Sequence, residues 1–354
     1  MSVSAIVHER AEQRHERMLA APNFVNGRFV NPSGKKPGLK GSSFNVMREY
    51  MTSKVVRTPP GALPMVDPIV AWRDRSHTGL RTTWLGHSTV LLELDGARIL
   101  TDPVWADRAS PFTSLGPKRF HRPPVALDRL PPLDAILVSH DHYDHLDAAT
   151  ISTLANAAPF ITALGVGARL EKLGVPSERI TELAWWETAE VPGTAVTISA
   201  TPAQHFSGRG ALDRNKTLWA SYVFKGPRHR VFFSGDTGLE PELAKIAKLH
   251  GPFDLVMLEV GAYHPAWGDI HLGPDQAMEA HTLLGGAPLL PVHWSTFDLA
   301  LHAWDEPILA LEHAARESSL PLLSPRLGQA TDVQDLDDVR RALTRIDPWW
   351  REVR

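Results

Sequence analysis

The segment Ser139-His140-Asp141-His142-Tyr143-Asp144-His145-Leu146-Asp147 decides the fold, and it directly follows a short apolar run. It places three imidazoles and a carboxylate within six residues. In an extended segment, side chains two residues apart point to the same side, so His140 and His142 can reach one point. A bend after them lets Asp144 and His145 face a second point nearby. Nitrogen and oxygen donors at this spacing are typical of two metal ions held close together.

Other candidate strands lead into residues of the same kind. The apolar run 135–138 precedes the segment above, and three more runs, at 195–198, 231–233 and 288–292, lead to His205, Asp236 and His293. Ligand-type residues at the ends of separate strands gather at one edge of a sheet, where α/β proteins place their sites. A histidine-rich surface turn is the alternative reading of the central segment, but it does not account for the other three strand ends.

Alternating strand and helix signals predict an α/β class. Residues 90–94 and 97–100 are apolar runs joined by Asp95-Gly96, a strong signal for a two-residue hairpin turn. A further strand is expected at 255–258. Helices are expected at 148–157, 240–250 and 274–284. Strands that alternate with helices in this way indicate an α/β protein.

Composition excludes several classes of protein. The chain has 354 residues, a formal net charge of −3 and no cysteine. The charge argues against nucleic acid as a partner, because binding phosphates needs a basic surface. Without cysteine, any metal must be held by His, Asp or Glu. No apolar run is long enough to span a membrane and no secretory signal is visible, so we expect a cytoplasmic protein.

The chain divides into two regions at about residue 80. Residues 1–80 open with a charged, helical stretch and continue through segments rich in Gly, Pro and Ser. We expect this region to be an N-terminal arm packed on the core, and residues 81–354 to form the main domain.

The ligand pattern resembles that of the metallo-β-lactamase superfamily. His-x-His-x-Asp-His is followed by a lone His, an Asp in Gly-Asp-Thr and a late His. The resemblance implies a four-layer αββα sandwich and two zinc ions, for which manganese or iron could substitute. It places His140, His142 and His205 on one ion and Asp144, His145 and His293 on the other, with Asp236 as a bridge.

Further segments resemble the N-acylphosphatidylethanolamine-hydrolysing phospholipase D family. They are Trp84-Leu-Gly-His-Ser-Thr, Leu100-Thr-Asp-Pro, Gly116-Pro-Lys-Arg-Phe, Trp185-Trp-Glu, Pro202-Ala-Gln-His, Asn215-Lys-x-Leu-Trp, Gly261-Ala-Tyr and His293-Trp-x-Thr-Phe. This likeness implies a zinc phosphodiesterase that acts on a lipid, with a homodimer and a peripheral membrane contact as further expectations. It also places His271 beside the metals as a catalytic proton donor. Residues 1–80 share no motif with the family.

Several neighbouring residues have two interpretations. Asp102 is expected to accept a hydrogen bond from a ligating histidine, with a strand-end turn as the alternative. His87 either lines the site or packs in the core. The glycines on either side of Asp236 are expected to allow a tight turn. The pairs Trp185-Trp186 and Trp349-Trp350 are expected in a core or dimer contact, with a lipid interface as the alternative.

The leading functional hypothesis is a dinuclear phosphodiesterase that uses a metal-bridging hydroxide, with Asp144 orienting it or accepting its proton. A lactonase or other carboxylic-ester hydrolase is the first alternative, since fold and metals serve both chemistries. A nuclease is disfavoured by the charge. A non-catalytic metal-binding protein is disfavoured because structural zinc sites are usually closed and four-coordinate.

Overall fold

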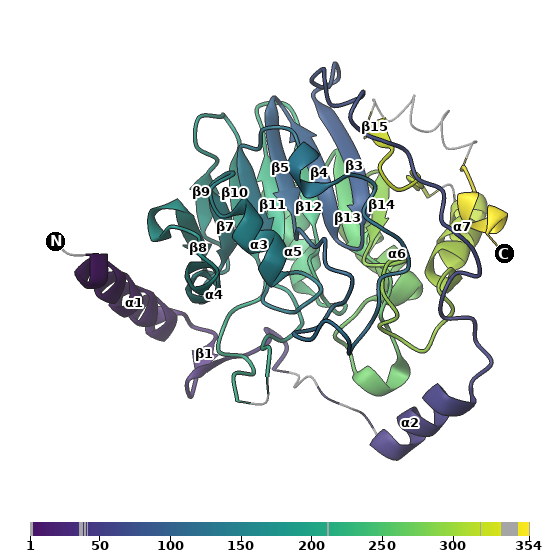
Figure 1. The fold of residues 1–354 in the computed structure, drawn as a ribbon, viewed down its shortest axis with the longest axis horizontal. Coiled ribbons are helices and arrows are strands. Elements are labelled where there is room, and N and C mark those ends of the chain that lie inside the picture. Colours follow the sequence, from purple (N-terminus) through teal and green to yellow (C-terminus); the bar gives the residue numbers. More distant parts are fainter. Residues whose placement is uncertain are drawn as a thin grey trace.

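The computed structural model describes residues 3–34, 38, 40, 42–210, 212–318, 320–333 and 346–353. Two β-sheets lie face to face, and helices cover their outer sides (Figure 1). The predicted α/β class and the four-layer sandwich are therefore confirmed.

The first sheet has seven strands in the order β15-β3-β4-β5-β6-β7-β8. Its strands are β3 (Leu80–Gly86), β4 (Thr89–Leu94), β5 (Ala97–Thr101), β6 (Ala135–Val138), β7 (Phe160–Ala163), β8 (Ile180–Leu183) and β15 (Ala330–Asp332). The predicted hairpin joins β4 to β5, with Leu94 opposite Ala97 across the antiparallel pair. Strands β5 to β8 pair in parallel, so their carboxyl ends lie at one edge.

The second sheet has six strands in the order β14-β13-β12-β11-β10-β9. Its strands are β9 (Thr188–Glu190), β10 (Thr197–Thr201), β11 (Ser221–Lys225), β12 (Arg230–Phe233), β13 (Leu255–Glu259) and β14 (Leu289–Val292). Strands β12, β13 and β14 are parallel to one another, and β10 has the same direction because β11 is antiparallel to both β10 and β12. Four of the six strands therefore end at one edge of this sheet too.

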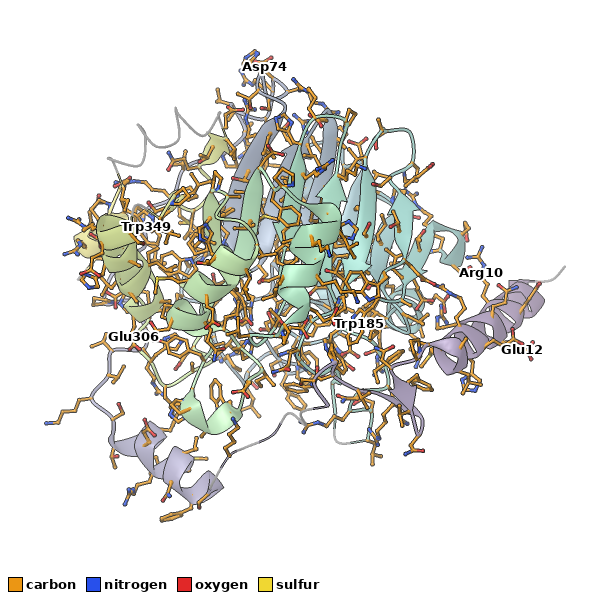
Figure 2. All side chains as sticks on the ribbon, turned by 180° about the vertical axis from the view of Figure 1, so that it is seen from behind. Arg10, Glu12, Asp74, Trp185, Glu306 and Trp349 are labelled. Atoms are coloured by element: carbon orange, nitrogen blue, oxygen red, sulfur yellow. The ribbon has the colours of Figure 1, made fainter. Side chains whose placement is uncertain are left out.

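Helices complete the outer layers. They are α3 (Ala148–Leu154), α4 (Gly167–Lys172), α5 (Glu242–His250), α6 (Gly273–Leu283) and α7 (Glu306–Ser318). Helix α4 contacts β8 of the first sheet, whereas α6 contacts β13 of the second sheet and both of its neighbours, α5 and α7. Figure 2 shows α5, α6 and α7 from behind, over the second sheet. None of the helices in the described ranges has the length and apolarity needed to span a bilayer.

Most predicted elements occur, with ends shifted by one to three residues. The strand expected at 195–198 begins two residues later, and the helix expected at 148–157 ends three residues earlier. The sequence patterns missed β3, β7, β8, β9, β11 and β15, along with α2 (Ser43–Thr52), α4 and α7. Several of these are short strands buried on both faces, where period-two alternation is lost.

Tryptophans pack together between the β3 end of the first sheet and the C-terminus. The rings of Trp84 and Trp294 stack with centroids 5.3 Å apart, and Trp349 stacks on Trp294 at 5.5 Å. Trp349 and Trp350 have no exposed surface. The core interpretation of this pair is confirmed, and the lipid-interface alternative is wrong for it. In the other pair, Trp186 is 37% exposed.

The N-terminal region consists of α1 (Val3–Ala20), the two short strands β1 (Phe24–Val25) and β2 (Arg28–Phe29), and α2. Helix α1 is attached through Arg14, whose guanidinium donates to Glu182 at 2.5 Å and to Glu171 at 2.7 Å. Phe29 is buried, and its backbone N–H donates to the carbonyl of Asn215 at 2.8 Å. Residues 21–34 thus run directly beneath a loop of the second sheet.

Candidate metal centre

All of the predicted ligands come together at the edge where the strands of both sheets end. His140, His142, Asp144 and His145 follow β6, His205 follows β10, Asp236 follows β12 and His293 follows β14. Asp144 and His293, which are 149 positions apart in the sequence, meet here. They do so because every one of these strands points to the same edge.

The first group of donors consists of His140, His142, His205 and Asp236. Nδ1 of His142 lies 2.8 Å from Nε2 of His140 and 3.2 Å from Nε2 of His205. Oδ2 of Asp236 lies 3.7 Å from Nε2 of His140 and 3.5 Å from Nε2 of His205. Four donor atoms therefore surround one point.

The second group consists of His87, Asp144, His145 and His293. Oδ2 of Asp144 lies 3.5 Å from Nε2 of His145 and 3.3 Å from Nε2 of His293. Asp236 also reaches this group, because its Oδ2 is 3.2 Å from Nε2 of His145 and its Oδ1 is 3.3 Å from Nε2 of His293. Asp236 is thus the carboxylate shared by both groups.

The hydrogen bonds behind the imidazoles fit a site for cations. Nδ1 of His145 donates to Asp102 at 2.8 Å, and Nδ1 of His205 donates to the carbonyl of Ile270 at 2.9 Å. With Nδ1 used as a donor, Nε2 presents its lone pair to the site. Nε2 of His145 and Oδ1 of Asp236 are buried and have no hydrogen-bond partner among the described residues. Buried polar atoms are rarely left unpaired, so these donors fit metal ions.

Electrostatics favour the same conclusion. Burial opposes ionisation of Asp144 and Asp236, but the surrounding histidines, of which His145 has the largest effect, together outweigh burial and hold the pKa of both carboxyls well below their usual range. Burial lowers the pKa of His140 and His205 well below the usual histidine value. The ionised carboxylates and the neutral rings of His140 and His205 are in the protonation states that metal binding requires. Despite burial, Asp236 raises the pKa of His145 and His293, so a metal ion has to displace a proton from each of these two rings.

Asp102 supports the segment that carries four of the donors. Besides His145, it accepts hydrogen bonds from the backbone N–H and the hydroxyl of Ser139, both at 2.7 Å. The Ser139 hydroxyl in turn lies 3.0 Å from Nδ1 of His140. The predicted contact between Asp102 and a histidine of the site is therefore present. One buried carboxylate orients two imidazoles.

Three polar residues of the site have a backbone in the left-handed region. Asp102, His87 and His293 have φ values of 36°, 52° and 64°. Such conformations are uncommon for residues other than glycine and persist only where surrounding contacts enforce them. At the turn around Asp236, Gly235 has φ 53°, and a Cβ at Gly238 would lie 1.9 Å from the carbonyl oxygen of Asp269. The two glycines therefore allow the tight turn that was predicted.

The N-terminal region also contributes to the site. The side chain of Asn31 is buried and accepts a hydrogen bond from the backbone N–H of His205 at 2.9 Å. Ser33 donates to the side chain of Gln204 at 2.6 Å. Sequence reasoning missed this role of Asn31, because nothing in the local pattern connects it with a residue 174 positions away.

His87 lies inside the site, where the sequence left two interpretations open. Its Nε2 is 3.0 Å from Oδ2 of Asp144, and its ring lies 4.0 Å from that of His293. Burial, followed by the neighbouring His293, lowers the pKa of His87 to about 3. His87 is therefore a neutral imidazole that donates to the Asp144 carboxylate.

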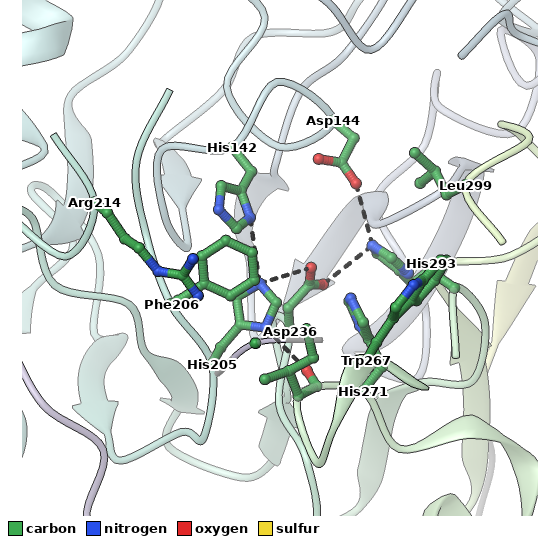
Figure 3. A pocket seen from close by; sticks show the side chains of 13 residues that line it. His142, Asp144, His205, Phe206, Arg214, Asp236, Trp267, His271, His293 and Leu299 are labelled. Carbon is green, nitrogen blue, oxygen red and sulfur yellow. Dashed lines mark hydrogen bonds and ion pairs between the residues drawn. The ribbon is translucent and has the colours of Figure 1, made fainter. Parts of the chain in front are cut away.

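A cavity of about 420 Å³ opens onto the donors (Figure 3). His142, Asp144, His205, Asp236 and His293 line it, together with the predicted catalytic residue His271. Among the described residues, the remaining wall is mostly apolar and includes one cationic side chain. It consists of Gly38, Phe206, Arg214, Ala262, Trp267, Ile270 and Leu299.

A family model described as a beta-lactamase superfamily domain matches residues 97–294, which is more than half of the chain. The chain belongs to the metallo-β-lactamase superfamily. An N-acyl-phosphatidylethanolamine-hydrolyzing phospholipase D of Caenorhabditis elegans is 41% identical over 295 residues, covering 77% of this chain and 82% of the relative. This similarity puts the chain in the phospholipase D-like branch of the superfamily.

Two further comparisons give one relative by sequence and one by structure. An uncharacterised protein of Mycobacterium tuberculosis is 44% identical over 338 residues, covering 94% of this chain and 88% of the relative. The crystal structure of an isothiocyanate hydrolase from Delia radicum gut bacteria superposes with a TM-score of 0.57 at 22% identity, covering 72% of this chain and 100% of that one. The latter supports the fold alone. Family and site together identify a metal-dependent hydrolase.

Replacing Asp102 with Asn should weaken metal binding. Asn tolerates the left-handed backbone but lacks the negative charge that orients His145 and Ser139. Loss of such an outer partner typically costs about 10–100-fold in metal affinity. Competition with a chromophoric zinc chelator measures this directly, and a thermal melt checks that the variant is folded. Asp128→Asn, in an exposed 3₁₀ helix, is the control and should bind metal as the unmodified protein does. Equal affinities for both variants would show that Asp102 does not support the metal centre.

Proposed function

We propose that this protein is a dinuclear metal-dependent phosphodiesterase of the N-acylphosphatidylethanolamine phospholipase D type. The observation that carries the proposal is the cavity over the donors, in which an apolar wall and Arg214 face the two groups of ligands. An apolar wall suits a lipid or another hydrophobic substituent, and a guanidinium suits a phosphate.

The two cations are assigned as the family pattern suggests. His140, His142 and His205 would hold one, Asp144, His145 and His293 would hold the other, and Asp236 would bridge them. We propose zinc, since His and Asp in this combination suit it, although manganese or iron also accepts these ligands. When bound, such a pair supplies a water that is acidic enough to give hydroxide near neutral pH and positive charge that stabilises a phosphorane-like transition state.

The protein's own side chains orient the substrate and move protons. Asp144 lines the cavity, and its Oδ2 faces the imidazole nitrogens of the second group, which leaves Oδ1 to orient the nucleophile or accept its proton. His271 lines the same cavity, and its Nδ1 is hydrogen-bonded to Glu259 at 2.6 Å. Nε2 of His271 is therefore the nitrogen that faces the substrate, and it can donate to the departing oxygen when the ring carries a second proton in addition to the one on Nδ1.

A lactonase or another carboxylic-ester hydrolase is the second candidate. The donors serve either chemistry, so only the residues around them can discriminate. Arg214 favours phosphorus, because a phosphodiester keeps a negative charge throughout the reaction, whereas a lactone or aryl ester is neutral when it binds.

A paired assay on zinc-loaded protein tests the reaction type. The substrates are bis(p-nitrophenyl) phosphate and an N-acylphosphatidylethanolamine on one side, and an acyl-homoserine lactone and an aryl ester on the other. We expect hydrolysis of the phosphodiesters alone, and its loss in His142→Ala. Hydrolysis confined to the lactone or the ester would contradict the proposal while leaving the fold and the metals intact.

Two variants in the same assay examine the assigned roles. Asp144→Asn should lower kcat far more than it raises KM, because the carboxylate acts on the nucleophile. Arg214→Ala should raise KM several-fold for the anionic diester and change kcat much less, because the guanidinium acts on binding of the phosphate. Equal effects of Asp144→Asn on kcat and KM, at unchanged metal content, would rule out its role with the nucleophile.

We also propose that α2 mediates a peripheral contact with anionic lipid. Its outward side chains include Phe44, Met47 and Met51, which are 71%, 59% and 77% exposed. On the other side of the helix, Glu49 pairs with His264 at 3.4 Å, and the ring of His264 lies beside that of the cavity-lining Trp267. Between Lys35 and Arg57 the sequence has six basic residues and one acidic residue, although the whole chain is acidic. An apolar helix with basic flanking segments of this kind suits an anionic bilayer.

Co-sedimentation with vesicles tests this contact without turnover. The protein should bind phosphatidylcholine vesicles that contain phosphatidylglycerol at least tenfold more tightly than pure phosphatidylcholine, at low salt. The double variant Phe44→Glu with Met51→Glu should abolish this binding and leave hydrolysis of bis(p-nitrophenyl) phosphate unchanged. Leu249→Glu alters another exposed apolar residue, on α5, and serves as the control. Equal binding of all three proteins would exclude α2 as the contact.

A further inference from the structure

A buried carboxylate that is absent from the predicted ligand set lies behind the cavity. Glu259 is the last residue of β13 and has no exposed surface. One of its oxygens, Oε2, accepts from Nδ1 of His271 at 2.6 Å. The other, Oε1, accepts from the backbone N–H of Thr237 at 2.7 Å and from that of Leu272 at 3.3 Å. Each oxygen of this carboxylate therefore has a defined donor.

The contacts of Glu259 fix where and how His271 is held. A carboxylate can only accept a hydrogen bond. Nδ1 of His271, which faces Glu259, must therefore carry a proton. The other nitrogen, Nε2, is then left to the cavity. The backbone N–H of Leu272 binds the same carboxylate and so restrains the chain next to the ring. Hydrogen bonds thus connect the carboxylate of Glu259 with both the ring of His271 and the backbone of Leu272.

The same carboxylate is also connected to the metal ligands. Thr237 directly follows Asp236, the carboxylate shared by both donor groups, and Oε2 of Glu259 lies 3.8 Å from Nδ1 of His293. The ring of His271 stacks against that of His293 with centroids 5.2 Å apart. Movement of Glu259 would therefore displace His271 relative to His293 and to a substrate in the cavity.

We propose that Glu259 is a positioning residue for the reaction, which holds His271 in the tautomer and orientation that direct Nε2 into the cavity. This inference rests on the proposed function, because it assumes that His271 acts on the substrate. A competing reading is that Glu259 is itself a ligand, since Asp236, Glu259, His271 and His293 have donor atoms within 4.8 Å of one another. The three N–H groups bound by Glu259 favour the positioning role.

Glu259→Gln tests the proposal, because it keeps the size of the side chain. Its amide can still accept from Thr237, but the amide nitrogen then faces Nδ1 of His271 and favours the other neutral tautomer, with the proton on Nε2. A neutral ring is a much weaker acid than the doubly protonated ring, which the Gln side chain no longer accommodates. We expect kcat for bis(p-nitrophenyl) phosphate to fall about 10²-fold, within the range of a lost proton donor, with KM changed less than threefold and metal content unchanged. Nitrogen-15 NMR of the histidine rings should show a change of tautomer for His271.

A double variant separates positioning from general damage to the site. If Glu259 acts through His271, then His271→Ala with Glu259→Gln should be no slower than His271→Ala alone. Glu312→Gln is the matched control, since Glu312 is 1% exposed but pairs with Arg316 and Arg351 on the outer face of the protein. This control should keep the unmodified kcat.

The inference is overturned by any of three results. These are an unchanged His271 tautomer in Glu259→Gln, a further loss of kcat in the double variant, or a loss of one metal ion per chain in Glu259→Gln, which would make Glu259 a ligand. If His271→Ala retains full kcat, the role of His271 in the proposed function fails. The NMR measurement on Glu259→Gln still decides whether Glu259 holds the ring.

Discussion

The buried carboxylate of Asp236 is the interaction on which the rest of the site depends. Its two oxygens lie within 3.7 Å of imidazole nitrogens from His140, His145, His205 and His293, which come from three other strand ends. A buried carboxylate is costly unless it is paired with positive charge. The fold meets this requirement by making the strands of both sheets end at one edge, so that donors from distant parts of the chain surround a single anion.

Hydrogen bonds from residues outside the ligand set hold the ligands in a defined geometry. Asp102 holds His145 and, through Ser139, His140, whereas Asn31 holds the backbone of His205. Glu259 connects the turn after Asp236 with His271. Each of these side chains is buried, and each acts on a residue far away in the sequence. The metal centre is therefore a property of both sheets and of the N-terminal region together.

The sequence predicted those parts of the structure that depend on local pattern. The β4–β5 hairpin followed from Asp95-Gly96, and the seven donors followed from short motifs after apolar runs. Other parts depend on contacts between distant segments. Asn31 carries no signal that connects it with His205, and Glu259 reads as the end of an ordinary buried strand. His87 remained ambiguous because its role requires the left-handed backbone that His293 and Thr296 enforce from the other end of the chain.

The most direct test of the account is the metal content of the purified protein, measured by mass spectrometry together with phosphodiester hydrolysis. The account predicts about two metal ions per chain, loss of both metal and activity with a strong chelator, and recovery of both with added zinc. It also predicts that Asp236→Ala binds neither ion tightly, since that carboxylate serves both groups. Binding of a single ion, or full hydrolysis by the metal-free protein, would contradict the account.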